Sequence, residues 1–223
     1  MAGVIQYFAR ETNWTPALGL WKEDFAASLL WSHDEKLNTT STRVDSSVFY
    51  MPTRSWLSLI KGVNYDHPGR HRRYTARVPT IPAINFDLRC DWEGPELTGR
   101  LVRADLEITG VLEIVKVTSR NESDALQCSL VNGTGPLEDV LIDTQNDLAD
   151  LLRPGATATL LQICVYHSKH WSTWRDGLLL KRVGKAGNIQ TFERIGIGSI
   201  RDRLLEDGTS HAFRGHPETI KLL

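Results

Sequence analysis

The sequence is poor in cysteine and has no long apolar run. Only Cys90, Cys128 and Cys164 occur in 223 residues, and a small, odd number of cysteines argues against a disulfide framework and favours a reducing compartment. The longest apolar stretch is about four or five residues, against the roughly 20 that a membrane-spanning helix needs. Residues 1–10 are too polar for the core of a signal peptide. We therefore expect a cytoplasmic protein with no membrane partner.

The chain also lacks an excess of either charge. It has 26 basic and 27 acidic side chains and a formal net charge of −1. A surface that binds nucleic acid broadly, or a polybasic membrane anchor, needs a basic excess. One basic and aromatic stretch at residues 67–77 resembles a phosphate contact, but it fits a solvated loop balanced by acid elsewhere. We expect no nucleic-acid partner. The 41% hydrophobic content excludes a disordered chain.

Common catalytic signatures are missing as well. The sequence contains no G-x-S-x-G, no H-E-x-x-H and no C-x-x-C, and Gly133-Thr134-Gly135 is a lone turn rather than a phosphate-binding loop. No common motif therefore indicates an enzyme, although the absence of these motifs does not exclude one. We expect no cofactor and no bound metal.

An amphipathic helix is predicted near the N-terminus. Thr15 is a suitable N-cap, and a proline at residue 16 fits a first helical turn. Apolar residues then recur at spacings of three and four, which places them on one face: Leu18, Trp21, Phe25 and Leu29. Residues 32–47 are polar and are interpreted as an exposed linker or loop. We therefore divide the chain into residues 1–46, a helix and linker that pack on the rest, and residues 47–223, a β-rich domain.

Residues 101–117 alternate between apolar and charged side chains. A hairpin turn at Thr109-Gly110 would place Glu113 opposite Leu106. A single strand instead keeps the apolar residues on one face through the glycine, so we predict one long strand, bent or bulged at Gly110. Its length indicates that it crosses two sheets or turns a corner. The predicted inward residues are Val102, Ala104, Leu106, Ile108, Leu112 and Ile114.

The remaining elements are short. Strands are predicted at residues 48–51, 56–60, 126–131, 140–142, 160–166, 178–183, 189–197 and 219–222, the pair around residues 184–188 forming a hairpin. Short helices are predicted at residues 145–152, with Thr144 as N-cap, and at residues 200–205. Nine or ten short strands with few helices predict a mainly β (α+β) fold. The expected architecture is an antiparallel β-sandwich or distorted barrel with an N-terminal helix and one or two short helices.

Four motifs occur in an order that resembles one known family. They are GLWKED at residues 19–24 with LLW at 29–31, YMPTRSWLSL at 50–59, LLLKR at 178–182 with FERIGI at 192–197, and TIKL at 219–222. This set resembles the GLW…LLW, Y-x-P-S-W-S-W-A-S and G-L-V-L-R-P…F-R-R-I-G segments of fungal heterokaryon-incompatibility (HET domain) proteins. Two departures are Thr53-Arg54, where the family has a serine-tryptophan step, and Val183, where it has proline.

The resemblance implies a function and a partner. In that family the HET domain precedes the GLW region and is tied to self/non-self discrimination and to the death of fused incompatible hyphae. The match here starts at Gly19, so the chain resembles the region downstream of the HET domain: a truncated paralogue, a fragment or a free-standing partner. The resemblance implies a non-enzymatic interaction or regulatory module, whose partner is a protein such as a HET-domain chain.

An enzyme of unknown type is the alternative, based on Cys164, His167 and His170. Their C-x2-H-x2-H spacing suggests a zinc site or a Cys/His catalytic pair. The spacing does not match the usual structural zinc patterns, and Cys164 and His167 have opposite parity on a strand. A buried strand cysteine followed by loop histidines explains the same residues.

Two further groups have a functional and a structural interpretation. Trp171 and Trp174 would stack on a sugar in a β-sandwich sugar-binding module if exposed, or cover the core if packed. Asp143, Asp147 and Asp150 fall at i, i+4 and i+7 of a helical pattern. They suit a divalent-ion or acid/base site, or a solvated helix face.

Overall fold

The structure is a computed structural model. It describes residues 2–18, 20–23, 25–33, 43, 52–55, 58–59, 63–64, 85–95, 99–120, 126–131, 136–167, 172–203 and 216–223. The strand predicted at 48–51 and the basic stretch at 67–77 lie outside the described residues. Of the strand predicted at 56–60, Leu59 is described and forms an isolated bridge with Arg43.

The N-terminal part consists of short elements: α1 (Ala2–Thr12), β1 (Pro16–Ala17), β2 (Leu20–Trp21), α2 (Phe25–Ser28), β3 (Ser32–His33) and β4 (Val63–Asn64). The helix predicted over residues 16–30 is therefore wrong, except for the single turn of α2. Leu18 has a left-handed φ of 55°, which interrupts an α-helix, and Pro16 pairs with Trp21 across β1 and β2. The apolar spacing still marked buried positions, because Leu18, Phe25 and Leu29 are all buried.

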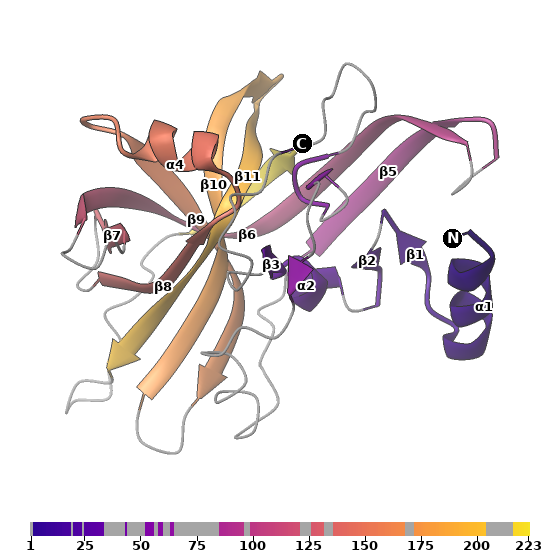
Figure 1. Cartoon of the computed structure of the whole chain (residues 1–223), viewed down its shortest axis with the longest axis horizontal. Helices are drawn as coiled ribbons and strands as arrows, with labels where there is room; N and C mark the ends of the chain where they lie inside the picture. Colours follow the sequence, from indigo (N-terminus) through magenta and orange to yellow (C-terminus); the bar gives the residue numbers. More distant parts are fainter. Residues whose placement is uncertain are drawn as a thin grey trace.

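The rest of the described chain forms one large sheet. Its elements are β5 (Asn85–Glu93), β6 (Arg100–Arg120), β7 (Leu126–Leu130), β8 (Pro136–Ile142), α4 (Gln145–Leu151), β9 (Thr157–His167), β10 (Ser172–Ala186), β11 (Ile189–Arg203) and β12 (Pro217–Leu222). The strand order is β10-β9-β6-β12-β11-β8-β7, with β5 beside β6, and only the β11–β12 pairing is parallel. The predicted mainly β class is confirmed, and the sheet is curled without making a closed barrel (Figure 1).

The predicted long strand is confirmed as β6, but its inward face changes along its length. Leu106 and Ile108 are buried in the main core cluster, whereas Val115 is buried in a second cluster. Ile114, predicted inward, is 47% exposed. The change follows the neighbours of β6, which pairs with β12 up to Val111 and with β9 from the next residue on. The strand therefore serves two cores from its opposite faces.

The C-terminal hairpin is longer than predicted. β10 and β11 pair from Ser172↔Arg203 to Ala186↔Ile189, with Gly187 at a left-handed φ of 64° in the turn. The helix predicted at residues 200–205 is wrong at its described residues, because β11 continues to Arg203 along its β10 partner. The predicted helix at 145–152 is confirmed as α4, and the last strand buries Ile220 and Leu222 as expected.

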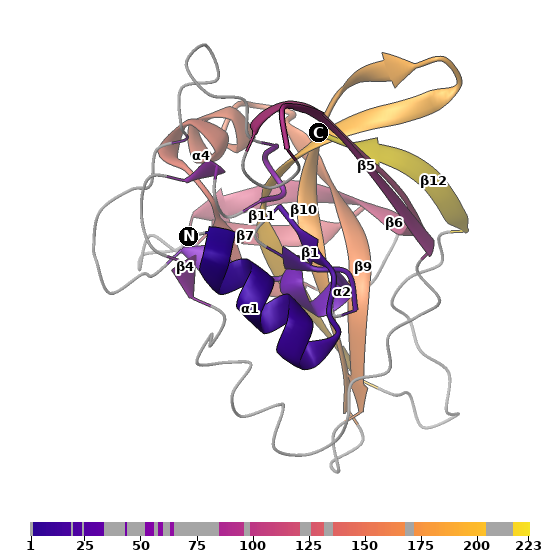
Figure 2. The same cartoon turned by 90° about the vertical axis from the view of Figure 1, so that its right-hand side faces the viewer.

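The main hydrophobic cluster joins the N-terminal part to the sheet. The ring of Phe25 stacks on Phe86 of β5, with centroids 4.6 Å apart. Leu29, Leu30 and Trp31 are fully buried in the same cluster as Leu161 and other sheet residues. Each such side chain contributes about 1.5–3 kcal/mol through burial. Residues 25–31 thus cover one face of the sheet, while α1 stands at the end of the molecule away from α4 (Figures 1 and 2).

Alanine substitutions at two glycines, Gly196 on β11 and Gly184 on β10, test how closely β11 and β8 approach. A Cβ on Gly196 would collide with the carbonyl oxygen of Leu141, whereas a Cβ on Gly184 would meet nothing within 4 Å. We expect Gly196→Ala to destabilise the protein by about 1–3 kcal/mol through overpacking, and Gly184→Ala to change stability by less than about 0.5 kcal/mol. Urea unfolding of both variants measures this. Equal stabilities would contradict the described β8–β11 register.

Candidate functional site

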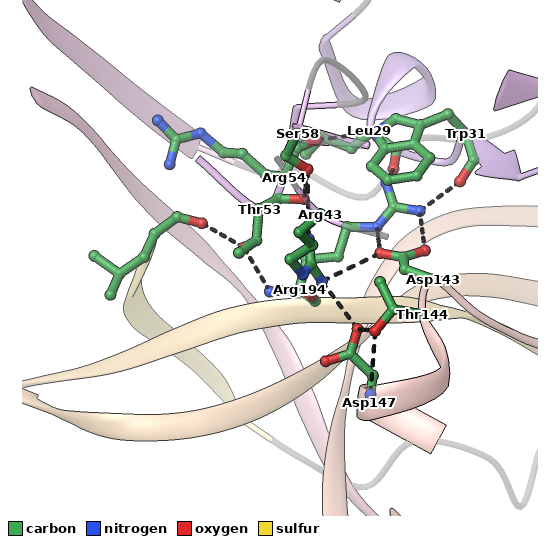
Figure 3. A network of polar contacts seen from close by, with 11 residues as sticks. Leu29, Trp31, Arg43, Thr53, Arg54, Ser58, Asp143, Thr144, Asp147 and Arg194 are labelled. Atoms are coloured by element: carbon green, nitrogen blue, oxygen red, sulfur yellow. Dashed lines mark hydrogen bonds and ion pairs between the residues drawn. The ribbon is translucent and has the colours of Figure 1, made fainter. Parts of the chain in front are cut away.

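Arg194 of β11 is a fully buried cation at the junction of the N-terminal part and the sheet (Figure 3). Its Nη1 donates a hydrogen bond of 2.8 Å to the carbonyl oxygen of Leu29, and its Nη2 donates to that of Trp31. The guanidinium carbon lies 3.3 Å from the centroid of the Trp31 ring. A buried guanidinium is costly unless it is paired and hydrogen-bonded, and here both carbonyls and the ring surround it.

Asp143 supplies the opposite charge. Its Oδ2 lies 3.1 Å from Nε of Arg194, and its Oδ1 accepts a hydrogen bond of 3.2 Å from Nη2. The carboxylate therefore meets one side of the guanidinium through one hydrogen bond and one ion-pair contact. Burial raises the pKa of Asp143, and the positive charges of Arg194 and Arg43 oppose that shift. The aspartate is held in place by its own N–H, which donates to the carbonyl oxygen of Ile195.

Arg43 links this pair to the start of α4. Its Nη2 donates to the carbonyl oxygen of Arg194 at 2.6 Å and to Oδ2 of Asp147 at 3.1 Å. Thr144 is the N-cap of α4, as predicted: its Oγ1 accepts from the N–H of Asp147 and donates to the carboxylate of the same residue. A carboxylate in the first helical turn is also favoured by the helix dipole.

Residues 53 and 54 join the same network to the last residues of the chain. The hydroxyl of Thr53 donates to a main-chain oxygen of Leu223 at 2.6 Å and accepts from the N–H of Arg194 at 3.0 Å. Arg54 is 1% exposed, and its Nη1 donates to the carbonyl oxygen of Leu222. The indole N–H of Trp31 donates in turn to the carbonyl oxygen of Arg54.

We call this set of residues the Arg194 clamp: Trp31, Arg43, Thr53, Arg54, Asp143 and Arg194. It ties together residues 29–31, Arg43, residues 53–54, the start of α4, β11 and β12. Its charged groups are bonded to each other and to carbonyl oxygens, so the arrangement suits holding segments together rather than reacting with a substrate. The sequence motifs at residues 50–59 and 192–197 contain three of the six clamp residues without revealing how they pair, because the partners lie 23 to 170 residues apart.

The three aspartates singled out in the sequence do not form one carboxylate site. Asp143 precedes α4 and pairs with Arg194, while Asp147 pairs with Arg43. Asp150 lies 2.5 Å from Nζ of Lys181, and this hydrogen bond lowers the pKa of the Asp150 carboxyl. Among the described residues no group of three His, Cys, Asp or Glu side chains could hold a metal ion.

Cys164 is fully buried in the main hydrophobic cluster, on β9. The side chain of His167 and all of His170 lie outside what the structure describes, so their distance from Cys164 is not part of the described geometry. Cys128 is buried too, and burial raises the pKa of its thiol to about 11. Apolar surroundings of this kind suit a packed cysteine better than a nucleophile.

The tryptophans divide between packing and exposure. Trp31 is fully buried, whereas Trp21, predicted on the apolar face, is half-buried and meets Trp14 edge to face, with 6.1 Å between the ring centroids. Trp174 packs partly on the main cluster, and the guanidinium of Arg201 lies 5.3 Å from its ring centroid. Trp171 lies outside the described residues. Of the predicted Trp171/Trp174 pair, Trp174 is the described member, and its ring packs against the core with the guanidinium of Arg201 over it.

The most exposed aromatic side chains of the described chain lie in residues 2–14, two of them on α1 and one just after it. Tyr7 is 54% exposed, Phe8 51% and Trp14 39%. Tyr7 and Phe8 meet edge to face, and Arg10 lies over the Tyr7 ring. Large aromatic side chains gathered outside a core are typical of protein–protein interfaces. Sequence reasoning interpreted the first thirty residues as helical but did not single out these rings, since it weighed only the apolar face that follows Thr15.

Comparison of the chain with known protein families, with curated proteins and with solved structures found no match. In the part of the chain that the structure describes, every helix is too short or too polar to cross a membrane.

Proposed function

We propose that this chain is a non-enzymatic interaction or regulatory module of the kind found downstream of the HET domain in heterokaryon-incompatibility proteins. Its partner would be another protein, and a HET-domain chain is the partner that the resemblance favours. The role would belong to self/non-self recognition and programmed cell death. The observation that carries the proposal is the exposed aromatic group of Tyr7, Phe8 and Trp14.

Two features of α1 support a role in binding a protein. First, the helix stands at one end of the molecule, with β1 and β2 between it and the large sheet (Figure 1), so a partner could reach it. Second, its exposed rings are large, rigid and amphipathic, and such rings contribute most of the energy in many interfaces. In the family that the motifs resemble, the HET domain precedes this region, which favours α1, near the N-terminal end, as the contact for a HET-domain chain.

The Arg194 clamp also supports this proposal, because it fixes the segment that follows α1. Arg194 and Asp143 hold residues 29–31 against the sheet, so α1 projects from a fixed base. A rigid base lowers the entropy lost when a partner binds. The enzyme alternative gains no such support, since Cys164 lies within the apolar core, and the sugar-binding alternative has in Trp174 a partly buried ring.

The test is a binding measurement with a HET-domain protein of the source organism. We expect the purified chain to bind it, and the double variant Tyr7→Asp/Phe8→Asp to bind at least about tenfold more weakly, since each lost interface aromatic costs roughly 1–2 kcal/mol or more. The readout is calorimetry or the retained fraction in a pull-down.

The matched control uses the same helix. Gln6→Asp adds a charge at an exposed position next to the rings, and Glu11→Gln removes one near the end of α1; both variants should bind as the unmodified chain does. Absence of binding by a well-folded chain would contradict the proposed partner, and equal weakening by Gln6→Asp and the double variant would contradict the aromatic group as the binding surface.

A further inference from the structure

A cavity of about 530 Å³ is lined by residues of β6, β9, β10, β11 and β12. Its volume falls in the range of small-molecule sites, about 300–1,000 Å³. At this place β6 stands between two strands, pairing with β12 up to Val111 and with β9 from Leu112 on. The β10–β11 hairpin extends past the last β9 pairing at Leu180 and supplies one wall.

The lining combines an apolar floor with polar walls. Phe192 and Leu112 belong to the main hydrophobic cluster and Ile114 is 47% exposed beside them. The polar lining residues are Glu113, Thr157, Thr159, Arg182, Gln190, His216 and Glu218. A cavity with an apolar floor and a few convergent polar groups is the usual form of a ligand site.

The charges of the cavity stand on two different walls. Arg182 lies on β10, whereas Glu218 lies on β12 and Glu113 on β6. Glu113 is only 5% exposed, and a buried carboxylate beside a cavity provides a strong local field. The side chains of Arg182 and Glu218 make no hydrogen bond or ion pair with any other described residue. Both charged groups are thus available to a bound molecule.

We propose that this cavity binds a small zwitterion with apolar side chains, of the size of a dipeptide. Arg182 would receive the carboxylate, which a guanidinium binds through two parallel hydrogen bonds. Glu218 would receive the ammonium group. The apolar side chains would lie on Phe192, Leu112 and Ile114. An extended dipeptide spans about 7 Å, which suits charges carried on separate walls. The site is independent of the aromatic group on α1.

The experiment is a titration of the full chain with leucyl-phenylalanine, followed by calorimetry. We expect binding with a Kd below about 1 mM. The same peptide with an acetylated amine and an amidated carboxyl group should bind at least about tenfold more weakly, because both charge contacts are lost. Arg182→Gln and Glu218→Gln should each weaken binding of the free dipeptide by about tenfold or more.

Two controls separate a lost site from a lost fold. Lys185→Gln removes an exposed cation from the same hairpin outside the cavity, and it should leave affinity unchanged. Arg182 and Glu218 are exposed, so their variants should melt as the unmodified chain does. The proposal is overturned by a Kd above about 1 mM, by equal binding of the blocked peptide, or by equal affinity of the Arg182→Gln variant and the unmodified chain. Binding of the dipeptide without binding of a HET-domain protein would leave this site standing and remove the proposed partner.

Discussion

Replacing Arg194 by methionine should lower the free energy of unfolding by about 3–5 kcal/mol. The substitution leaves the carboxylate of Asp143 buried without its main counter-charge, and removing one partner of a buried pair costs this much. It also leaves the carbonyl oxygens of Leu29 and Trp31 without their donor. In a chain of this size the melting temperature should fall by roughly 10 °C. Urea unfolding with a thermal melt measures both quantities.

The control for this variant is Arg182→Met. Arg182 lies on the neighbouring strand β10 and is exposed, so the same chemical change there should cost less than about 0.5 kcal/mol. A double variant, Arg194→Met with Asp143→Leu, should recover at least about 1 kcal/mol of the loss, because no buried charge is then left unpaired. A strictly additive double variant would show that the two side chains do not interact as described.

Replacing Trp31 by alanine should be about as damaging, at about 3–5 kcal/mol. The ring is fully buried, and truncation of a buried tryptophan leaves a cavity as well as removing apolar contacts. It also removes the face on which the Arg194 guanidinium rests, at 3.3 Å from the ring centroid, and the indole donor to the carbonyl oxygen of Arg54. Equilibrium unfolding in urea gives the loss directly.

Two further variants serve as comparisons for the stability loss expected of Trp31→Ala. Trp14→Ala removes a ring that is 39% exposed and should cost less than about 1 kcal/mol. Trp31→Phe keeps a buried ring but removes the indole donor, and should cost about 1–3 kcal/mol. If Trp31→Ala were no more destabilising than Trp14→Ala, residues 29–31 would not be part of the core that joins the two parts of the chain.

Periodicity predicted the sheet well and the N-terminal part poorly. The alternation in residues 101–117 predicted β6, because a strand repeats every two residues whatever its neighbours are. The same alternation could not show that Ile114 is exposed, since the face of β6 that packs on a core depends on what covers each part of the strand. In residues 16–30, spacings of three and four marked buried side chains but not a helix, because the turn at Leu18 has a left-handed backbone.

The clamp was beyond sequence reasoning for a different reason. Asp143 was singled out as one of three acidic residues in a helical pattern, and an isolated pattern gives no sign of a partner 51 residues away. Arg194 occurs in an apolar strand, which is a signal of a buried cation, yet only the fold supplies the two carbonyl oxygens of residues 29 and 31 that satisfy it. The N-cap at Thr144 could be predicted, because a cap and its helix are adjacent in sequence.

Hydrogen exchange of the chain, alone and with a HET-domain protein of the source organism, tests the central claim most directly. We expect the amides of α1 to exchange readily in the free chain and to become protected on mixing, since this helix is the proposed binding element. The amide of Thr53, which donates to Leu223, should exchange only through global unfolding in both samples. Unchanged exchange in α1 on mixing would contradict the account of α1 as the surface that binds a HET-domain chain.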